Sequence, residues 1–328
     1  MRKANFFFGL LLLLFCLSCT SNEKQSDLRL PEAHGKINTI SVIMDDVLWN
    51  GEIGDTLRKK LAAPVDGLQD EEPLFTINQY SPKIFDASVK NSRTLIVVSK
   101  SDIPQFKHVE NQYAFPQNVF YISGYTSSEI IRTIELHANT LVSSLKYYEI
   151  IENQRLNAIT PFNDKSIKEA FGITLQLPNT FQYAIRNKDF CWLKKDVPSG
   201  NLNLLLYKIP FSSFSENDNL AQKIIDIRDS VGRKYVKGLY NNAGMITEES
   251  YAPYFQKIRL DHKTTYETRG TWELENGFMN GPFLNYVIED PTNQCYLIAD
   301  GFVYNPSSAK RDFVFELEAI IKSIHFLK

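Results

Sequence analysis

The sequence predicts a protein of the α+β class with two domains, each a mainly antiparallel sheet packed by amphipathic helices. Its 328 residues are 43% hydrophobic and 23% charged, with only 15 glycines, which is typical of a globular chain and excludes disordered and collagen-like ones. Helical and strand periodicities occupy separate runs. Because strands and helices do not alternate regularly, a doubly wound parallel sheet is not expected.

The chain begins with a targeting segment. Arg2 and Lys3 precede the apolar run Phe6–Phe15, and small or polar residues follow. A positive start, a short apolar run and a small residue before a cleavage point are typical of a secretory signal. The run is shorter than the roughly 20 apolar residues that a transmembrane helix needs. We therefore predict that residues 1–18 form a signal peptide and that the mature chain is exported.

Cys19 is the predicted lipidation site. Leu17-Ser18-Cys19 resembles the end of a bacterial lipobox, in which the cysteine becomes the acylated first residue of the mature protein. Sulfur can carry a diacylglycerol as a stable thioether, and palmitate-like chains anchor firmly because each buried CH2 contributes about 0.8 kcal/mol. The alternative is an ordinary cleaved signal with an incidental cysteine. The predicted location is the cell envelope, on the periplasmic side or at the outer membrane.

A tether and an N-terminal domain are expected next. Residues 19–35 are mostly polar and contain Pro31 and Gly35, which indicates a tether. The N-terminal domain is predicted to span residues 36–158. Its expected elements are a short helix at Asp55–Leu61 and strands at Ile37–Met44, Leu74–Tyr80, Thr94–Val98 and Val119–Ile122.

The segment Ser127–Arg155 predicts one long amphipathic helix, roughly 40 Å in length at 1.5 Å per residue. Thr126 and Glu129 have the spacing of a capping box. The helix is expected to pack on a sheet, and a coiled-coil dimer is the alternative. Its apolar stripe consists of Ile130, Ile134, Ala138, Leu141, Leu145 and Tyr148.

The C-terminal domain is predicted to span residues 159–328, after a boundary segment that contains Pro161. Helices are expected at Ser166–Phe171, closed by Gly172, at Leu220–Tyr235 and at Phe313–Ile324. The expected strands are Ile173–Leu177, Phe181–Arg186, Phe190–Leu193, Leu202–Ile209, Tyr254–Leu260, Thr264–Arg269, Phe283–Glu289 and Cys295–Tyr304. This order of hairpin, helix, meander and terminal helix is similar to that of PsbP-type domains.

Several segments carry a resemblance to a known family. Glu267–Glu273, Met279–Phe283, Val303–Pro306 with Lys310-Arg311, and Phe190–Leu193 resemble the domain-of-unknown-function family 4837. That family consists of envelope lipoproteins of Bacteroidetes-type bacteria and has no assigned activity. The resemblance therefore implies a location and does not imply a chemistry.

The densest polar cluster is the candidate ligand-binding site. Glu267, Arg269 and Glu273 share one strand face by alternation, which would place carboxylates on both sides of a guanidinium. Such a row can bind an anionic or sugar-like ligand, or support acid/base chemistry if one carboxylate is desolvated. A structural ion-pair row is the other interpretation, and Trp272 would then face the core.

Cys191 and Cys295 remain in the mature chain besides Cys19. They form a disulfide in an oxidising envelope or stay as two buried reduced thiols, and both interpretations are open. Neither cysteine has a second metal ligand at short spacing, and the five histidines form no i, i+4 pair. We predict no metal and no cofactor.

Two weaker signals concern the surface of the protein. Lys310-Arg311 precede the last predicted helix, and we expect them to form a solvated helix start, since recognition of a lipid surface takes about four or more clustered cations. Exposed aromatic rings could also stack on sugar rings, although most are expected in the core or at its rim. The candidates are Tyr147, Tyr148, Tyr251, Tyr254 and Phe255.

The predicted function is that of a membrane-anchored envelope lipoprotein of unknown molecular activity, acting as a non-catalytic binding or assembly component. Its predicted partners are the membrane, through the N-terminal lipid, and an envelope protein. Nucleic acid is excluded as a partner because the chain has 36 basic and 38 acidic residues, whereas nucleic-acid-binding proteins have an excess of basic residues. The alternative is a cell-envelope enzyme acting on glycan or peptidoglycan near Arg269 and Glu273, although no serine-hydrolase, P-loop or dinucleotide motif occurs.

Overall fold

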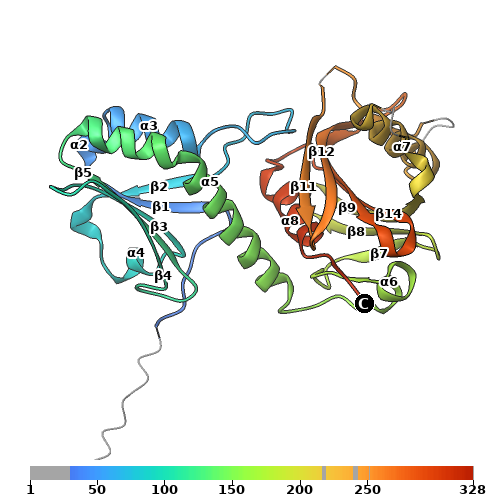
Figure 1. The fold of residues 1–328 in the computed structure, drawn as a ribbon, viewed down its shortest axis with the longest axis horizontal. Coiled ribbons are helices and arrows are strands. Elements are labelled where there is room, and N and C mark those ends of the chain that lie inside the picture. Colours follow the sequence, from blue (N-terminus) through green and yellow to red (C-terminus); the bar gives the residue numbers. More distant parts are fainter. Residues whose placement is uncertain (1–29, 216–218, 239–242, 251, 328) are drawn as a thin grey trace, which may run out of the picture.

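The computed structural model describes residues 30–215, 219–238, 243–250 and 252–327. Two regions lie side by side, each with its own sheet, and one long helix connects them (Figure 1). The predicted α+β class is therefore confirmed. The predicted signal peptide and Cys19 lie outside the described residues. None of the described helices is both long and apolar enough to span a bilayer.

The sheet of the N-terminal region is mainly parallel. It contains β1 (Thr39–Ile43), β2 (Thr76–Tyr80), β3 (Thr94–Lys100), β4 (Gln105–Glu110) and β5 (Asn118–Gly124) in the order β2-β1-β3-β5-β4. β1, β2, β3 and β5 are parallel, and β4 pairs antiparallel with β5 at one edge. The prediction of an antiparallel sheet is wrong for this region.

Short helices explain why the parallel connections were missed. After β1 the chain forms α2 (Asp46–Trp49) and α3 (Glu52–Leu61), and before β3 it forms α4 (Ala87–Lys90). A four-residue helix is too short to show a helical period. The sequence therefore predicted only the helix that lies within α3, between β1 and β2, and no helix between β2 and β3. The buried strands do have the nearly continuous apolar runs of a parallel sheet.

The predicted long helix is α5 (Ser127–Asn157), which has 31 residues. Thr126 and Glu129 form the predicted capping box. With α3, the first half of α5 covers one face of the sheet, and Ile130, Ile134 and Leu141 lie in the core there. The helix thus packs on a sheet, as predicted. Its second half runs past the sheet to the C-terminal region, where Gln154 Nε2 donates to the Ala319 carbonyl at 2.9 Å (Figure 1).

The C-terminal region contains an eight-stranded antiparallel sheet, in the order β10-β12-β13-β14-β9-β8-β7, with β11 also paired to β12. The helices are α6 (Lys165–Phe171), α7 (Leu220–Tyr235) and α8 (Arg311–Lys322). The strands of this sheet are β7 (Gln182–Arg186), β8 (Phe190–Val197), β9 (Gly200–Pro210), β10 (Met245–Thr247), β11 (Tyr254–Leu260), β12 (Lys263–Leu274), β13 (Asn280–Asp290) and β14 (Cys295–Tyr304). The predicted order of hairpin, helix, meander and terminal helix is confirmed.

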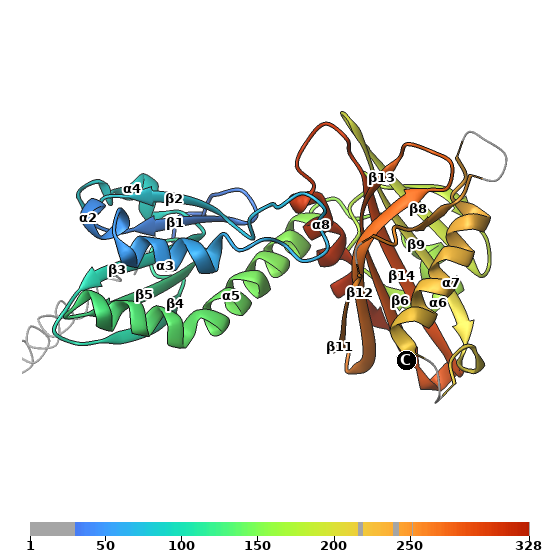
Figure 2. The same ribbon diagram turned by 90° about the horizontal axis from the view of Figure 1, so that it is seen from above.

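Helices cover both faces of this sheet. α8 lies on the side that faces the N-terminal region, and α7 lies on the opposite side (Figure 2). Leu317 and Ile320 of α8 pack into one core, whereas Ile224 of α7 packs into a second core with Trp272 and Phe302. A small separate ladder joins β6 (Ile173–Thr174) to β15 (His325–Phe326). The predicted strand Ile173–Leu177 is thus only two residues long.

Cys191 and Cys295 are both free and buried. On the intervening strand β9, Cys191 lies opposite Leu206 and Cys295 lies opposite Pro210. Four residues along a strand span about 13 Å, and the two cysteines also lie two strand spacings apart. A disulfide needs Cα atoms within about 7 Å. The disulfide alternative is therefore not formed in this fold, because register holds the two thiols apart.

Candidate functional site

Two of the three residues of the predicted polar row meet in the structure. On the α8 side of β12, Arg269 Nε donates to Glu267 Oε1, and Arg269 Nη2 lies 2.8 Å from Glu318 Oε1. The second carboxylate on the guanidinium therefore belongs to α8. Glu273 lies near Glu248 instead, and its pKa is raised by burial and by the neighbouring negative charge.

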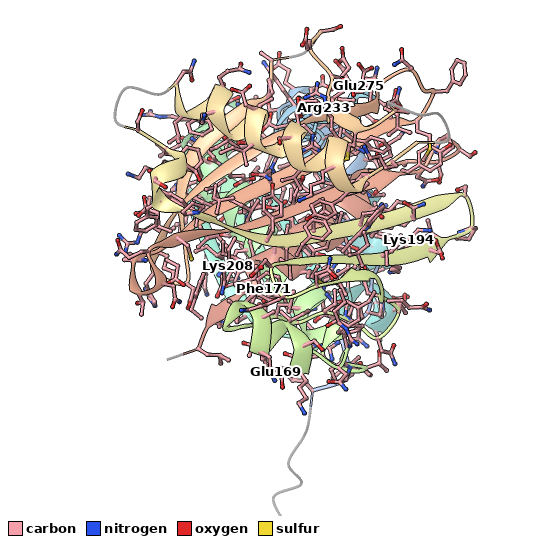
Figure 3. All side chains as sticks on the ribbon, turned by 90° about the vertical axis from the view of Figure 1, so that its right-hand side faces the viewer. Glu169, Phe171, Lys194, Lys208, Arg233 and Glu275 are labelled. Atoms are coloured by element: carbon pink, nitrogen blue, oxygen red, sulfur yellow. The ribbon has the colours of Figure 1, made fainter. Side chains whose placement is uncertain are left out.

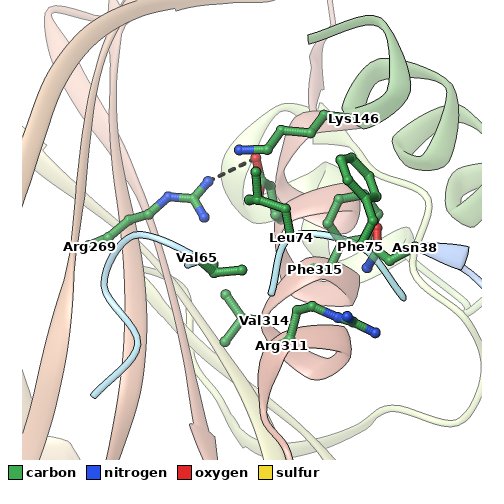
Figure 4. Close-up of a pocket in the computed structure, with 10 residues that line it drawn as sticks. Asn38, Val65, Leu74, Phe75, Lys146, Arg269, Arg311, Val314 and Phe315 are labelled. Atoms are coloured by element: carbon green, nitrogen blue, oxygen red, sulfur yellow. Dashed lines mark ion pairs between the residues drawn. The ribbon is translucent and has the colours of Figure 1, made fainter. Parts of the chain in front are cut away.

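The Arg269 cluster lies at the junction between the two regions. Figure 4 shows the side chains of Arg269 and Lys146 entering the same pocket from opposite sides, and Arg269 is ion-paired with Glu318 of α8. The cavity there has a volume of about 30 Å³, which is room for one or two waters. Asn38 Oδ1 lines it without a hydrogen-bond partner among the described residues. A cavity of this size favours the structural interpretation of the cluster.

Two cations, Arg269 and Lys322, stabilise the charged form of Glu318. Burial alone would raise its pKa, but Arg269 and Lys322 outweigh burial and lower the pKa to about 2. Lys322 Nζ lies 2.5 Å from Glu318 Oε1. The chain also passes close to this cluster at Gly67, where an added Cβ would lie 2.7 Å from Arg269 Cβ. The junction therefore depends on both charge and close backbone contact.

The start of α8 is hydrogen-bonded to the N-terminal region. Glu72 accepts the backbone N–H groups of Lys310 and Arg311 at 2.7 and 2.8 Å. Arg311 Nη1 also donates to the Pro73 carbonyl at 3.0 Å. The expectation of a solvated helix start was wrong, because it could not include a carboxylate more than 200 residues away. Among the described residues, no group of three or more His, Cys, Asp and Glu side chains can hold a metal ion.

A larger pocket lies on the other face of the same sheet, on the α7 side. We call it the aromatic pocket, and its volume is about 330 Å³. This is within the range of small-molecule sites. Strands β7, β8, β9, β12 and β14 contribute to it. Its lining residues are Ala184, Trp192, Lys194, Asn201, Asn203, Val236, Lys237, Trp272, Leu274, Met279, Phe302 and Tyr304.

Hydrogen bonds and ring contacts fix the walls of the aromatic pocket. Trp192 Nε1 donates to Asn203 Oδ1 at 2.9 Å, and Trp272 Nε1 donates to the Val303 carbonyl at 3.1 Å. The Trp272 and Phe302 rings pack edge to face with centroids 5.4 Å apart. Trp272 and Phe302 are buried, whereas Trp192 remains half-exposed. The pocket thus has a rigid aromatic floor and an accessible indole wall.

The local sequence explains this construction. An added Cβ at Gly281 would lie 2.1 Å from the Val303 carbonyl, so only glycine lets β13 begin so close to β14. The turn between β12 and β13, which leads to Met279, is tied to α7 because Arg233 Nε lies 2.9 Å from Glu275 Oε1. Figure 3 shows this pair above the strand that carries Lys194.

The polar groups of the aromatic pocket are cationic or amide. Lys194 is half-buried and Lys237 is exposed. Lys194 Nζ lies 2.8 Å from Asp196 Oδ1, but an ion pair with such an exposed carboxylate is weak and exchangeable. Asn201 has a side-chain amide on the same wall. Aromatic faces beside amines and an amide suit a ring-bearing ligand with an acidic group.

Sequence reasoning missed this pocket. The stacking candidates Tyr147, Tyr148, Tyr254 and Phe255 lie outside the lining, and Tyr251 is not among the described residues. The residues that form the pocket are up to 120 positions apart, and strand pairing alone brings them together. One signal was present, since Trp192 and Trp272 lie in segments that carry the family resemblance.

Comparison with known proteins gives a family. A profile described as "Domain of unknown function (DUF4837)" matches residues 160–323, half of the chain. The chain belongs to the DUF4837 family. A second profile, "Domain of unknown function (DUF8532)", matches residues 33–158. The whole aromatic pocket lies within the DUF4837 match.

Other comparisons add little. No curated protein matches this DUF4837 chain. Among solved structures it is similar to the Saccharomyces cerevisiae Ran-binding protein Mog1p, with 9% identity and a TM-score of 0.32. That similarity covers 48% of this chain and 91% of the other.

Proposed function

We propose that this DUF4837 protein is a lipid-anchored component of a bacterial cell envelope that binds a small acidic, ring-bearing ligand in the aromatic pocket. The lipobox-like Leu17-Ser18-Cys19 supports the anchor and the exported location. The anchor keeps the binding site near the membrane surface, where an envelope protein is the expected partner.

The aromatic pocket is the observation that carries the binding function. It has two half-exposed aromatic walls, Trp192 and Tyr304, and amines at Lys194 and Lys237. Its described lining contains no carboxylate, imidazole or thiol. Such a lining can hold a ring and an anionic group by stacking and charge, which supports binding without turnover.

Tryptophan fluorescence tests the binding site directly, because the chain has only three tryptophans. Glucuronate is the probe, with glucose as the matched ring without charge and acetate as the acid without a ring. We expect glucuronate to change the emission most. Trp192→Phe should abolish that change, and Lys194→Met should weaken binding by about tenfold.

Trp49→Phe is the matched control, since Trp49 belongs to the N-terminal region. It should leave the glucuronate response unchanged. The binding proposal is contradicted if glucose and glucuronate give the same response, or if Trp192→Phe binds like the parent chain.

Mass spectrometry of the processed N-terminus tests the anchor independently. We expect a diacylglyceryl thioether on Cys19 and membrane fractionation of the parent chain. Cys19→Ser should lose both, whereas Cys16→Ser, which alters the neighbouring thiol of the leader, should keep both. An unacylated start or an intact Met1 would refute the anchor and leave the pocket untouched.

A further inference from the structure

The carboxyl ends of the parallel strands form one edge of the N-terminal sheet. This edge lies at the end of the molecule farthest from the C-terminal region (Figure 1). Each parallel strand is followed there by an exposed large apolar side chain. In sheet order these are Ile84, Val47, Ile103 and Tyr125, with exposed fractions of 53%, 80%, 70% and 67%. We call this set of residues the distal edge.

A crevice of about 360 Å³ opens in the distal edge. It lies between the ends of β1, β2 and β3, and its apolar lining includes Val47, Leu48, Pro82 and Val98. A volume of this size accepts one large aliphatic or aromatic side chain. The strand order β2-β1-β3 also places it where connections leave the sheet in opposite directions, which is where open parallel sheets most often bind.

The rim of the crevice has an excess of negative charge. Three carboxylates, Asp45, Asp46 and Asp102, are exposed just after β1 and β3, against Lys83 and Lys100. Of these five residues, Asp45 and Lys100 line the crevice itself. Negative charge opposes an anionic lipid surface, and it also opposes a second copy of the same edge. Basic residues beside an apolar anchor complement this rim.

We infer that the distal edge binds a segment of a partner protein in which one large apolar side chain is flanked by lysine or arginine. The apolar side chain fills the crevice, and the basic residues face Asp45, Asp46 and Asp102. An anchor in a pocket surrounded by a charged rim is the usual construction of a specific protein contact. This inference does not depend on the aromatic pocket.

Fluorescence anisotropy with labelled synthetic peptides tests it, using the chain from residue 19 with Cys19→Ser. The probe peptide has a central leucine between two lysines on each side. One matched peptide replaces the leucine by alanine, and another replaces the lysines by glutamates. We expect only the parent peptide to bind, with an affinity that falls as salt rises.

Val47→Asp should weaken this binding by about tenfold or more, since it places a charge at the mouth of the crevice. Leu136→Asp is the matched control, because Leu136 on α5 is 75% exposed and lies outside the crevice lining. Trp192→Phe should also bind normally, which separates this site from the aromatic pocket.

Any of four outcomes would overturn the inference. Two concern the peptides: no binding at millimolar concentration, or equal binding of all three peptides. One is equal binding by the Val47→Asp and Leu136→Asp variants. The fourth is a preference of the distal edge for phosphatidylglycerol vesicles or for a second copy of the chain. The last would show as a dimer in sedimentation that Val47→Asp dissociates.

Discussion

Two arginines that are paired with carboxylates, Arg269 and Arg228, lie on opposite faces of the C-terminal sheet and have different surroundings. On the α8 side, Arg269 contacts both Glu267 and Glu318, and Lys322 adds a second cation. On the α7 side, Arg228 Nε lies 3.2 Å from Asp300 Oδ2, and the guanidinium carbon lies 3.7 Å from the centre of the Phe283 ring. Arg228 is buried and Arg269 is partly buried, but the pKa values of their partners Asp300 and Glu318 are shifted in opposite directions.

Asp300 is the weaker acid of the two carboxylates. Burial raises its pKa to about 6, and Arg228 offsets only part of that effect. Several buried polar groups on the same face have atoms without a hydrogen-bond partner among the described residues. They are Tyr207, Thr268, Asn285 and Asp300.

The comparison shows that the charges around a buried carboxylate set the direction of its pKa shift. At Glu318, Arg269 and Lys322 outweigh burial and lower the pKa, whereas at Asp300 burial and the neighbouring Asp229 outweigh Arg228 and raise it. The junction is thus built from satisfied charges. The interior beneath α7 is polar but incompletely paired, and it adjoins Phe302 at the floor of the aromatic pocket.

Removing Arg269 should give the largest effect. Arg269→Met leaves Glu267 and Glu318 buried without their shared partner, so we expect a loss of about 3–5 kcal/mol in the free energy of unfolding. Urea denaturation measures it. Arg233→Ala is the control, since Arg233 is half-exposed in its pair with Glu275 and should cost less than about 1 kcal/mol. Equal effects of the two variants would contradict the contrast between buried and exposed pairs.

The pH dependence of stability should differ between the two clusters. Asp300 has a folded-state pKa of about 6, above its ordinary value of 3.8. Its protonation therefore stabilises the fold fully below pH 3.8, and this contribution, about 3 kcal/mol, is lost as the pH rises through 6. Glu318, lowered from 4.5 to about 2, stabilises above pH 4.5, and that contribution is lost as the pH falls toward 2.

Two variants separate these contributions in unfolding curves measured from pH 3 to pH 8. Asp300→Asn should remove the change in the free energy of unfolding between about pH 4 and 6. Glu318→Gln should reduce the loss of that free energy as the pH falls below about 4.5. If Asp300→Asn leaves the slope between pH 4 and 6 unchanged, the contrast between the clusters is wrong.

Loss of the Glu72 carboxylate, which caps the start of α8, should lower stability by a smaller amount. Glu72→Ala removes the acceptor of the Lys310 and Arg311 N–H groups, and we expect a cost of about 1–2 kcal/mol. Thermal unfolding measures it. The neighbouring Glu71→Ala, at an exposed position, should change the melting temperature little. Equal shifts would mean that the cap contributes nothing to the junction.

Elements with a local signal were predictable. The apolar period and the Thr126–Glu129 capping box gave α5, and Gly172 closes α6 with a φ of 69° as expected. The connection from β2 to the parallel strand β3 was not predictable, because its helix α4 is a single turn. Of the candidate site, Glu267 and Arg269 share a strand and could be paired from sequence.

By itself the sequence determined the class and most elements, because periodicity and helix caps depend on residues a few positions apart. Only the tertiary structure decided that Arg269 meets Glu318, that Glu72 caps α8, and that Trp192 and Trp272 share one pocket. Each of these contacts joins distant segments, and which segments meet follows from sheet order and helix packing across the whole chain. Local propensities do not encode that order.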